Sequence, residues 1–311
     1  MINKQANTEP YKERKPFTLP SAHSDMRRVY AYLLKNHLLD RDIVTHFVRE
    51  KLIYESCERV ENKQGKWKEY HNAVFVGLDE NGVARHAHKR GLYTKGGYKG
   101  NVDSSDPAYS FHYIGSGSRL HVFEAPIDML SYLSLNPKDW QRQSYAALCG
   151  VAEHAMLKIL DLYPHLSDIS FCLDHDITGI EAAGRLSELL AEKGYSQVSS
   201  LWPQYKDWNE DIKAARGLVA LTAKNHPQLA VCAPVCDRIA GIMNNVPKSA
   251  DPEKQIPGLL DRFNNYLHWG KSQKAVECME NVAALVGADS AKHHRPIGQE
   301  LRQGRLRDYR G

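Results

Sequence analysis

The chain has 311 residues, of which 42% are hydrophobic and 25% charged, and its formal net charge is +4. This length and composition are those of a globular protein with two or three modest domains. The small net charge excludes a strongly basic protein, so binding to nucleic acid has to come from local patches. No stretch approaches the roughly 20 apolar residues that span a bilayer, and no apolar signal core is present, so we expect a cytoplasmic protein without membrane contact.

The N-terminal part predicts a tail followed by two helices. Residues 1–22 are polar and charged, and we expect them to form a flexible tail. In the stretch 24–56, Ser24 or Asp25 can cap a first helix and Asp40 a second. Two helices that pack on their own domain are the preferred interpretation, and a helix-turn-helix reader of nucleic acid is the alternative.

The next stretch, 69–113, changes to short alternating segments separated by turn sequences. The segments 72–78, 83–88 and 109–114 predict a small antiparallel sheet. This part also holds a basic run without acids: Arg85, Lys89, Arg90, Lys95 and Lys99. Two tyrosines interleave with it, so it has charges for phosphates and rings for base stacking, although a solvated hairpin is the alternative. Four histidines alternate with other residues on strand-like segments, and we assign them to surface or packing positions rather than to a metal site: His86, His88, His112 and His121.

Strands and helices then alternate regularly. Near-continuous apolar runs predict strands at 120–123, 145–148, 169–173 and 197–202. Between them, helical periodicity predicts helices at 127–135, 153–162 and 178–193. Such an alternation is typical of an α/β domain with a parallel, Rossmann-like sheet and crossover helices.

The remainder of the chain, after Asp211, predicts a helical region with a basic tail. The expected helices are 212–225, 235–244, 256–267 and 271–286. The six cysteines are spread along the chain, as expected of reduced thiols. The close pair Cys232 and Cys236 would need two more ligands, with His293 and His294 as candidates, to hold zinc; ordinary thiols are the preferred interpretation.

Acidic residues follow two of the predicted parallel strands. Glu124 comes directly after the strand 120–123, and Asp174 and Asp176 follow the strand 169–173. The carboxyl ends of parallel strands meet at one edge of a sheet, so we expect these acids to lie close together. Their mutual repulsion would be neutralised by a hard cation such as Mg²⁺ or Mn²⁺, although an Asp before a helix can also be a simple N-cap.

This ordered set of acids resembles the Toprim domain of primases, topoisomerases and related nucleases. The matching residues are Glu124, Asp128, Asp174, Asp176 and Gly179. The family's common Gly after the Glu is Ala125 here, which is a departure in the turn and not in the acids. Two further segments extend the resemblance toward primases of mobile elements: the small-residue segment ending in Gly150, and the Lys206-Asp207-Trp208-Asn209 segment.

The resemblance implies a role for each matching residue. Glu124 and Asp128 are the expected catalytic residues, with Asp128 in support. The expected metal ligands are Glu124, Asp174, Asp176 and Asp207, holding Mg²⁺ or Mn²⁺. The expected residues for nucleic acid or nucleotides are Arg85, Lys89, Arg90, Lys95, Lys99, Gly150 and Lys206.

The resemblance also implies an organisation and a function. We expect a flexible tail at 1–22, a primase-like α+β nucleic-acid-binding subdomain at 23–115, a Toprim catalytic domain at 116–216, and a helical region with a basic tail at 217–311. The implied activity is metal-dependent nucleotidyl or phosphoryl transfer in replication or transfer of a mobile element. The implied partners are single-stranded DNA or RNA and nucleotides, with a helicase, relaxase or zinc-ribbon protein as further candidates.

Two other functions remain open on the same residues. A Toprim nuclease would use the same acids with water as the nucleophile; the sequence lacks a Gly-x-x-x-x-Gly-Lys ATPase motif, which disfavours the ATPase-coupled nucleases. The second alternative is a non-catalytic accessory protein that binds nucleic acid.

Overall fold

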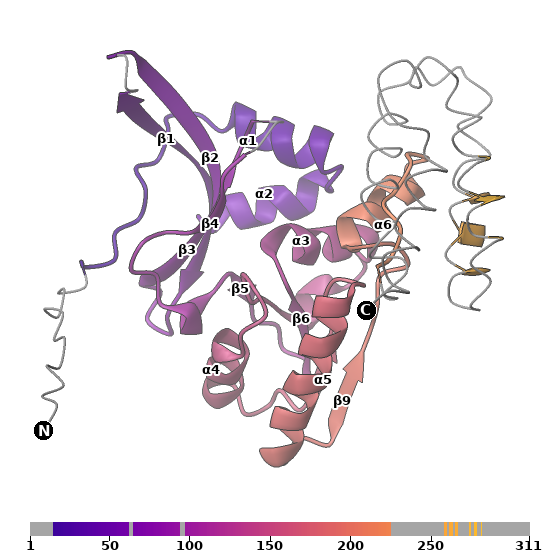
Figure 1. The fold of residues 1–311 in the computed structure, drawn as a ribbon. Coiled ribbons are helices and arrows are strands. Elements are labelled where there is room, and N and C mark those ends of the chain that lie inside the picture. Colours follow the sequence, from indigo (N-terminus) through magenta and orange to yellow (C-terminus); the bar gives the residue numbers. More distant parts are fainter. Residues whose placement is uncertain are drawn as a thin grey trace, which may run out of the picture.

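The structure is a computed structural model that describes residues 15–61, 65–93 and 97–224, with isolated helical positions between 258 and 281 (Figure 1). The described positions from 258 to 266 are helical and fall within the predicted helix 256–267. The predicted helix 235–244, the basic tail, Lys95 and the candidate zinc ligands Cys232, Cys236, His293 and His294 lie outside the described residues.

The N-terminal part combines short helices with an antiparallel sheet. Its helical elements are α1 (Arg27–Ala31), the π-helix η1 (Tyr32–Asn36) and α2 (Arg41–Arg49). As predicted, Asp40 caps α2, because its side chain accepts hydrogen bonds from the backbone N–H groups of Asp42 and Ile43. The sheet has the order β1-β2-β3-β4. Its strands are β1 (Ile53–Glu61), β2 (Trp67–Leu78), β3 (Ala84–Gly91) and β4 (Lys99–Asn101).

Three predictions about this part are wrong. Residues 53–56 were assigned to a helix and instead begin β1, which pairs with β2 along nine residues. Neither Ser24 nor Asp25 is the N-cap of α1, since Met26 holds that position without a side-chain hydrogen bond. The segment 109–114 contributes only β5 (His112–Tyr113), which pairs with the second sheet instead of the first.

The second sheet has the order β5-β7-β6-β8-β9 and contains the predicted parallel strands. Strands β7, β6, β8 and β9 run parallel, and β5 is antiparallel to β7. Each of the predicted strands is present within a few residues. Their bounds are β6 (Arg119–Phe123), β7 (Ser144–Ala147), β8 (Asp168–Phe171) and β9 (Gln197–Ser200).

Helices cover both faces of this sheet, and each predicted crossover helix is present. They are α3 (Pro126–Leu135), α4 (His154–Leu162), α5 (Ile177–Glu192) and α6 (Trp208–Ala215). Alternate strand residues face opposite sides, so Val122 packs with the α4 and α5 side while Phe123 packs with the α3 and α6 side. The predicted helix 212–225 is wrong in its bounds, because α6 starts at Trp208 and ends at Ala215.

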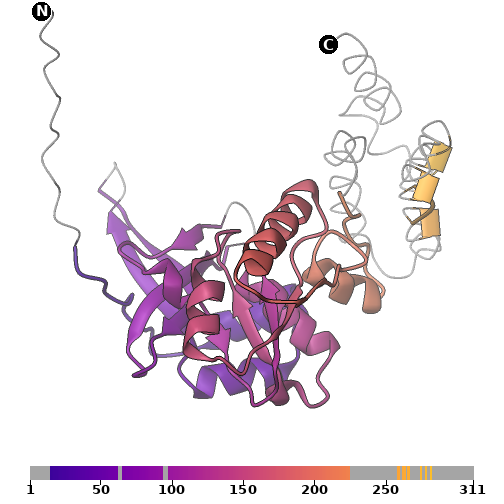
Figure 2. The ribbon, with the colours of Figure 1, turned by 90° about the horizontal axis from the view of Figure 1, so that it is seen from below.

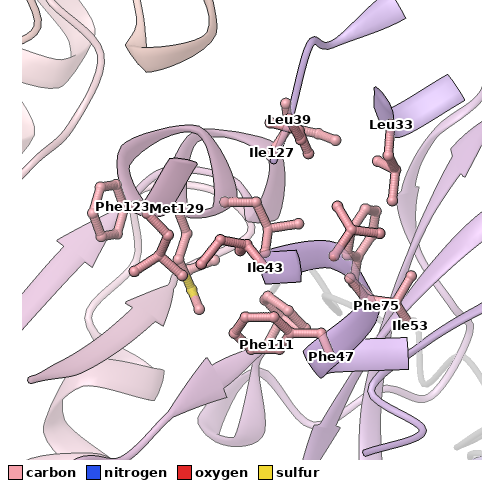
Figure 3. Close-up of a cluster of buried hydrophobic side chains, with 14 of the residues drawn as sticks. Leu33, Leu39, Ile43, Phe47, Ile53, Phe75, Phe111, Phe123, Ile127 and Met129 are labelled. Carbon is pink, nitrogen blue, oxygen red and sulfur yellow. The ribbon is translucent and has the colours of Figure 1, made fainter. Parts of the chain in front are cut away.

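One hydrophobic cluster contains residues of both sheets and joins them. Phe47 of α2 and Phe75 of β2 pack against Phe111, and the same cluster continues to Phe123 and Met129 in the second part (Figure 3). Figure 1 shows α2 between the first sheet and α3, and Figure 2 shows α5 alongside the second sheet. The shared core fixes β3 and β4 relative to the carboxyl edge of the second sheet. Among the described residues, no helix is long and apolar enough to cross a membrane.

Candidate active site at the carboxyl edge of the second sheet

The predicted acids gather at the carboxyl edge of the parallel strands. Glu124 follows β6 directly, and Asp174 lies three residues beyond β8. Asp128 lies in the first turn of α3, where it is buried with 8% exposure. Asp176 and Asp207 are the N-caps of α5 and α6. Glu124, Asp174, Asp176 and Asp207 each raise the pKa of another acid in the group, and three of them raise that of Asp128, so the five form one electrostatic cluster.

Asp174 lies at the centre of this cluster and is short of partners. Burial, together with the charges of Asp207 and Glu124, raises its pKa to about 7. Its Oδ2 lies 3.7 Å from Lys206 Nζ. Its Oδ1 is buried and makes no hydrogen bond within the described part of the chain. A buried carboxylate oxygen without a partner is costly, so this atom is suited to bind a cation.

Glu124 and Asp128 also have raised pKa values. The main cause for both is burial, which disfavours the charged carboxylate. Asp176 raises the pKa of Glu124 further, while Lys99 and Lys206 lower it. The pKa of Asp128 is well above its ordinary value, because Asp174 and Asp207 add their charge to the effect of burial. Burial and mutual repulsion therefore oppose the ionisation of these carboxyl groups, and the nearby lysines offset this only in part.

Lys206 is the cation inside the cluster. Its Nζ lies 3.4 Å from Asp207 Oδ2 and 3.7 Å from Asp174 Oδ2. The charges of Asp207 and Asp174 raise its pKa against the opposing effect of burial, which keeps the ammonium charged. Its backbone also positions the loop after β8, since the His175 N–H donates to Lys206 O.

Two of the acids serve as helix caps as well. Asp176 Oδ1 accepts a hydrogen bond from the Gly179 N–H at 2.9 Å, and Asp207 Oδ1 accepts one from the Glu210 N–H at 2.9 Å. The N-cap alternative raised by the sequence is therefore realised at both positions. A cap uses one carboxylate oxygen and leaves the second one available to a ligand.

Gly179 is needed for lack of space and not for its backbone angles, since its φ lies outside the left-handed region. A Cβ atom at this position would lie 2.1 Å from Asp174 O, far closer than any real contact. The first turn of α5 can approach the Asp174 loop only because residue 179 has no side chain. Gly150 has a positive φ of 149°, and its N–H donates to Glu124 O at 3.1 Å, so it holds the loop that carries Glu124.

The predicted basic residues are not all equivalent. Lys99 of β4 is exposed, and its charge lowers the pKa of Glu124, so it lies near the acidic cluster. The charge of Arg90 lowers the pKa of His37 and of His88, so this side chain lies near those histidines. Arg85 and Lys89 are engaged in ion pairs, Arg85 Nε with Asp79 at 2.7 Å and Lys89 Nζ with Glu58 at 2.6 Å. The structure therefore brings Lys99 and Lys206 to the acids and holds Arg85 and Lys89 in other contacts.

The histidines assigned to packing are mostly buried. His86, His88 and His121 are each at most 5% exposed, and burial lowers the pKa of each to about 4. His112 is partly buried, and its Nδ1 donates to Ser110 O.

Sequence reasoning missed the contacts that hold α6 over the site. The Trp208 indole N–H donates to Cys172 O at 2.9 Å, directly before the Asp174 loop. The Asn209 amide donates to His37 O at 2.7 Å and to Ser131 Oγ at 3.1 Å. The partners are far apart in the sequence, so no local pattern could have identified them.

The acidic cluster is wider than a closed metal cage. Within the described residues, the sets of three His, Cys, Asp or Glu ligand atoms that come within 4.8 Å of one another lie instead in the N-terminal part, around His71. An ion at the acidic cluster would therefore keep water or substrate oxygens among its ligands. Mg²⁺ commonly binds in this way, through one or two carboxylates plus phosphate oxygens. The unpartnered Asp174 Oδ1 fits such an ion, and so do the crowded carboxyl groups, because a bound cation would favour their charged forms.

A comparison with known protein families identifies the domain that contains the second sheet. Residues 121–212 match the family described as Toprim-like. These residues form a Toprim-like domain. The α/β fold predicted from the sequence is confirmed, and so is the resemblance that the acids suggested. Residues 31–117 match a family described as a protein of unknown function (DUF3991).

Solved structures similar to the chain include three primases. The primase fragment of the bacteriophage T7 primase-helicase protein is 17% identical, with a TM-score of 0.44 over 59% of this chain and 69% of that one. The E. coli primase catalytic core is 14% identical, with a TM-score of 0.43 over 89% and 90%. The Aquifex aeolicus primase, with its zinc-binding and RNA polymerase domains, is 14% identical, with a TM-score of 0.35 over 91% and 63%. None of the curated proteins compared with the chain matches it.

Proposed function

We propose that the protein is a primase-like enzyme that uses Mg²⁺ or Mn²⁺ to transfer nucleotidyl or phosphoryl groups on single-stranded DNA or RNA. The observation that carries this proposal is the buried, unpartnered Oδ1 of Asp174 among five carboxyl groups at the carboxyl edge of the Toprim-like domain. Clefts outside the carboxyl ends of parallel strands are the usual binding sites of α/β folds.

The divalent ion would be held by Glu124 and Asp174, with Asp176 and Asp207 in support. Hard carboxylate oxygens of this kind suit Mg²⁺ or Mn²⁺. When bound, the ion would stabilise the charge on the phosphoryl oxygens of the substrate. Lys206, between Asp174 and Asp207, adds a fixed positive charge beside the same oxygens.

Glu124 is the candidate general base. In nucleotidyl transfer, a hydroxyl oxygen attacks the α-phosphorus of a nucleotide, the bond to diphosphate breaks, and the hydroxyl proton must be accepted. Burial raises the pKa of Glu124, which makes its carboxylate a better proton acceptor near neutral pH. Asp128 is buried in the first turn of α3 and raises the pKa of Lys206, so we assign it a supporting role beside that ammonium.

The nucleic-acid strand is proposed to cross from the first sheet to the acidic cluster. Lys99 on β4 is exposed and close enough to lower the pKa of Glu124, so we propose that it binds a phosphate of the strand that approaches the acidic cluster. Tyr93 and Tyr98 are 47% and 53% exposed and provide faces for base stacking. We extend the proposal to a cytoplasmic role in replication or transfer of a mobile element, with a helicase, relaxase or zinc-ribbon protein as partner.

The test is incubation of the purified protein with labelled single-stranded DNA, nucleotides and Mg²⁺ or Mn²⁺. We expect extended products whose yield falls at least about 100-fold in Asp174→Ala/Asp176→Ala. Asp161→Ala, on the exposed face of α4, is the matched control and should keep activity. Shortened template that is lost in the double variant would assign a nuclease instead. Metal-independent binding without turnover would assign a non-catalytic accessory protein.

A further inference from the structure

A second set of metal-ligand residues lies in the first sheet, outside the Toprim-like domain. Cys57 of β1 lies directly opposite His71 of β2, and Glu69 precedes His71 by two residues, so all three face the same side of the sheet. Cys57 Sγ lies 3.6 Å from His71 Nε2, and Glu69 Oε2 lies 3.8 Å from the same nitrogen. These ligand atoms all lie within 4.8 Å of one another.

The spacing of these atoms fits a tetrahedral ion. Bonds of roughly 2.0–2.3 Å from zinc to nitrogen, oxygen and sulfur place neighbouring ligand atoms roughly 3.4–3.6 Å apart at a tetrahedral angle. The observed separations of 3.6 and 3.8 Å are therefore close to the bound geometry. The third pair, Cys57 and Glu69, lies within 4.8 Å. The Glu69 side chain is 54% exposed and its Oε1 lies 3.6 Å from Arg59 Nε, so ion binding would draw this carboxylate from that ion pair toward Cys57.

A buried carboxylate orients His71 for this role. Its Nδ1 lies 2.7 Å from Glu55 Oε1, and the Glu55 side chain is fully buried. A carboxylate accepts hydrogen bonds, so Nδ1 carries the proton and donates it to Glu55. The lone pair then resides on Nε2, which faces Cys57 and Glu69. A carboxylate that fixes the tautomer of a ligating histidine is a recurring support of zinc sites.

The opposite side of His71 does not suit a metal. His23, Glu55 and His71 also have ligand atoms close together. However, the guanidinium Nη1 of Arg28 lies 3.5 Å from Glu55 Oε1 and 3.3 Å from His71 Nδ1, and its charge would repel a cation. In addition, His23 Nδ1 already accepts a hydrogen bond from the Asp25 N–H. The ligand set is therefore the one on the Nε2 side.

Space for a further ligand lies beside these residues. A cavity of about 460 Å³ is lined by Glu69 and His71 together with residues of α1, of η1 and of the segment after β3: Arg28, Tyr32, Leu92 and Tyr93. It borders two of the three proposed ligands, Glu69 and His71, so a water molecule that completes a tetrahedral ion could reach them from this side. A thiolate, an imidazole and one carboxylate form a set that favours Zn²⁺ over Mg²⁺.

We propose that Cys57, Glu69 and His71 bind one zinc ion, with water as the fourth ligand. On binding, the Cys57 thiol loses its proton to solvent and its sulfur bonds the ion. The site lies where β1 and β2 leave the core and extend as an exposed ribbon, so the ion would clamp the two strands together. This proposal does not depend on the activity of the Toprim-like domain.

The first experiment uses Co²⁺ as a spectroscopic probe of the full chain after removal of metals by chelation. A tetrahedral site with one thiolate gives a sulfur-to-cobalt charge-transfer band and intense visible bands. We expect these bands in the wild type and their loss in Cys57→Ser, with Zn²⁺ affinity weakened at least about 100-fold. The bands should persist in Cys232→Ser/Cys236→Ser and in Asp174→Ala. Persistence of the bands in Cys57→Ser, or their absence from the wild type, would overturn the proposal.

A second measurement separates metal binding from a purely structural role. Zn²⁺ should raise the unfolding temperature of the wild type by mass action and leave that of Cys57→Ser unchanged. Glu55→Gln tests the orientation of His71 and should weaken Zn²⁺ binding about 10- to 100-fold while keeping the cobalt bands at saturating Co²⁺. Should Cys57→Ser fail to fold, the exposed Glu69 can be replaced instead, and Glu69→Gln should reduce the rise in unfolding temperature that Zn²⁺ causes. An equal thermal shift by Zn²⁺ in wild type and variants would contradict the assignment.

Discussion

Asp174 connects the fold of the Toprim-like domain to its electrostatics. Its carboxyl has a pKa of about 7 in the folded protein, raised first by burial and then by the neighbouring acids. The same group has a pKa of about 3.9 in an unfolded chain. Between these two values the folded state binds more protons than the unfolded state. The free energy of unfolding should therefore decrease as the pH rises from about 4 to about 7.

Replacing Asp174 by Asn should remove this contribution. In metal-free buffer, we expect Asp174→Asn to be more stable than the wild type above pH 7, by about 1–3 kcal/mol, and nearly equal to it at pH 4. Urea unfolding at several pH values measures the difference. Asp161→Asn, at an exposed position on α4, is the control and should parallel the wild type. A wild type whose stability is flat from pH 4 to 7 would contradict the raised pKa.

The close approach at Gly179 gives a second prediction for a single residue. Gly179→Ala should force the Asp174 loop away from α5 and destabilise the protein by about 1–3 kcal/mol, because the new methyl group would lie 2.1 Å from Asp174 O. Gly184→Ala, in the same helix with nothing within 4 Å of its Cβ, is the control. Since Ala is the better helix former, this control should gain about 0.5–1 kcal/mol. Equal effects of the two substitutions in denaturant unfolding would argue against the crowding.

At the scale of elements, polar contacts of Asn209 dock α6 in addition to its buried side chains Trp208 and Ile212. Asn209 donates to His37 O and Ser131 Oγ, and its Oδ1 lies 2.8 Å from His37 Nδ1. Asn209→Ala would leave the His37 groups unpaired in a partly buried position. We expect a loss of about 1–3 kcal/mol in unfolding free energy. Asn36→Ala, on the exposed end of η1, should change it by less than about 0.5 kcal/mol. Indistinguishable unfolding curves for the two variants would show that this docking is energetically minor.

Elements with strong local patterns could be predicted, and elements with long-range causes could not. The strand β6 is an apolar run, and α5 follows an N-cap and shows helical periodicity, so both are recognisable in the sequence. In β1, by contrast, Glu55 and Cys57 place polar groups on the face that meets His71 of β2, so the strand lacks an apolar alternation that local sequence could reveal. The strand β5 has only two residues, and its pairing with β7 spans about thirty positions of chain.

The same distinction applies to the candidate site. The acids Glu124 and Asp174 could be located because each follows a parallel strand, and parallel strands share one carboxyl edge. The unpartnered state of Asp174 Oδ1, and the position of Lys206 between two acids, depend on tertiary packing. Arg85 and Lys89 belonged to the same basic run as Lys99, but their ion pairs could be seen only in the folded chain.

At the scale of the whole molecule, the shared core holds the first sheet against the Toprim-like domain. Phe75 of β2 and Phe123 of β6 belong to one buried cluster, so the strands of the two parts are fixed relative to each other. This arrangement brings Lys99 of β4 close enough to Glu124 to lower the pKa of that carboxyl. A strand of nucleic acid bound there would contact both parts at once.

Binding to nucleic acid should therefore depend unequally on the basic residues. We expect Lys99→Ala to weaken binding to single-stranded DNA about 5- to 10-fold in metal-free buffer and to reduce the salt slope by about 0.7, the contribution of one phosphate contact. Arg85→Ala should have little effect, because its guanidinium is paired with Asp79 at 2.7 Å. Fluorescence anisotropy over a series of salt concentrations measures both quantities. If Arg85→Ala lowers the slope and Lys99→Ala does not, the strand follows the β2–β3 hairpin instead, and the proposed path to the acidic cluster is wrong.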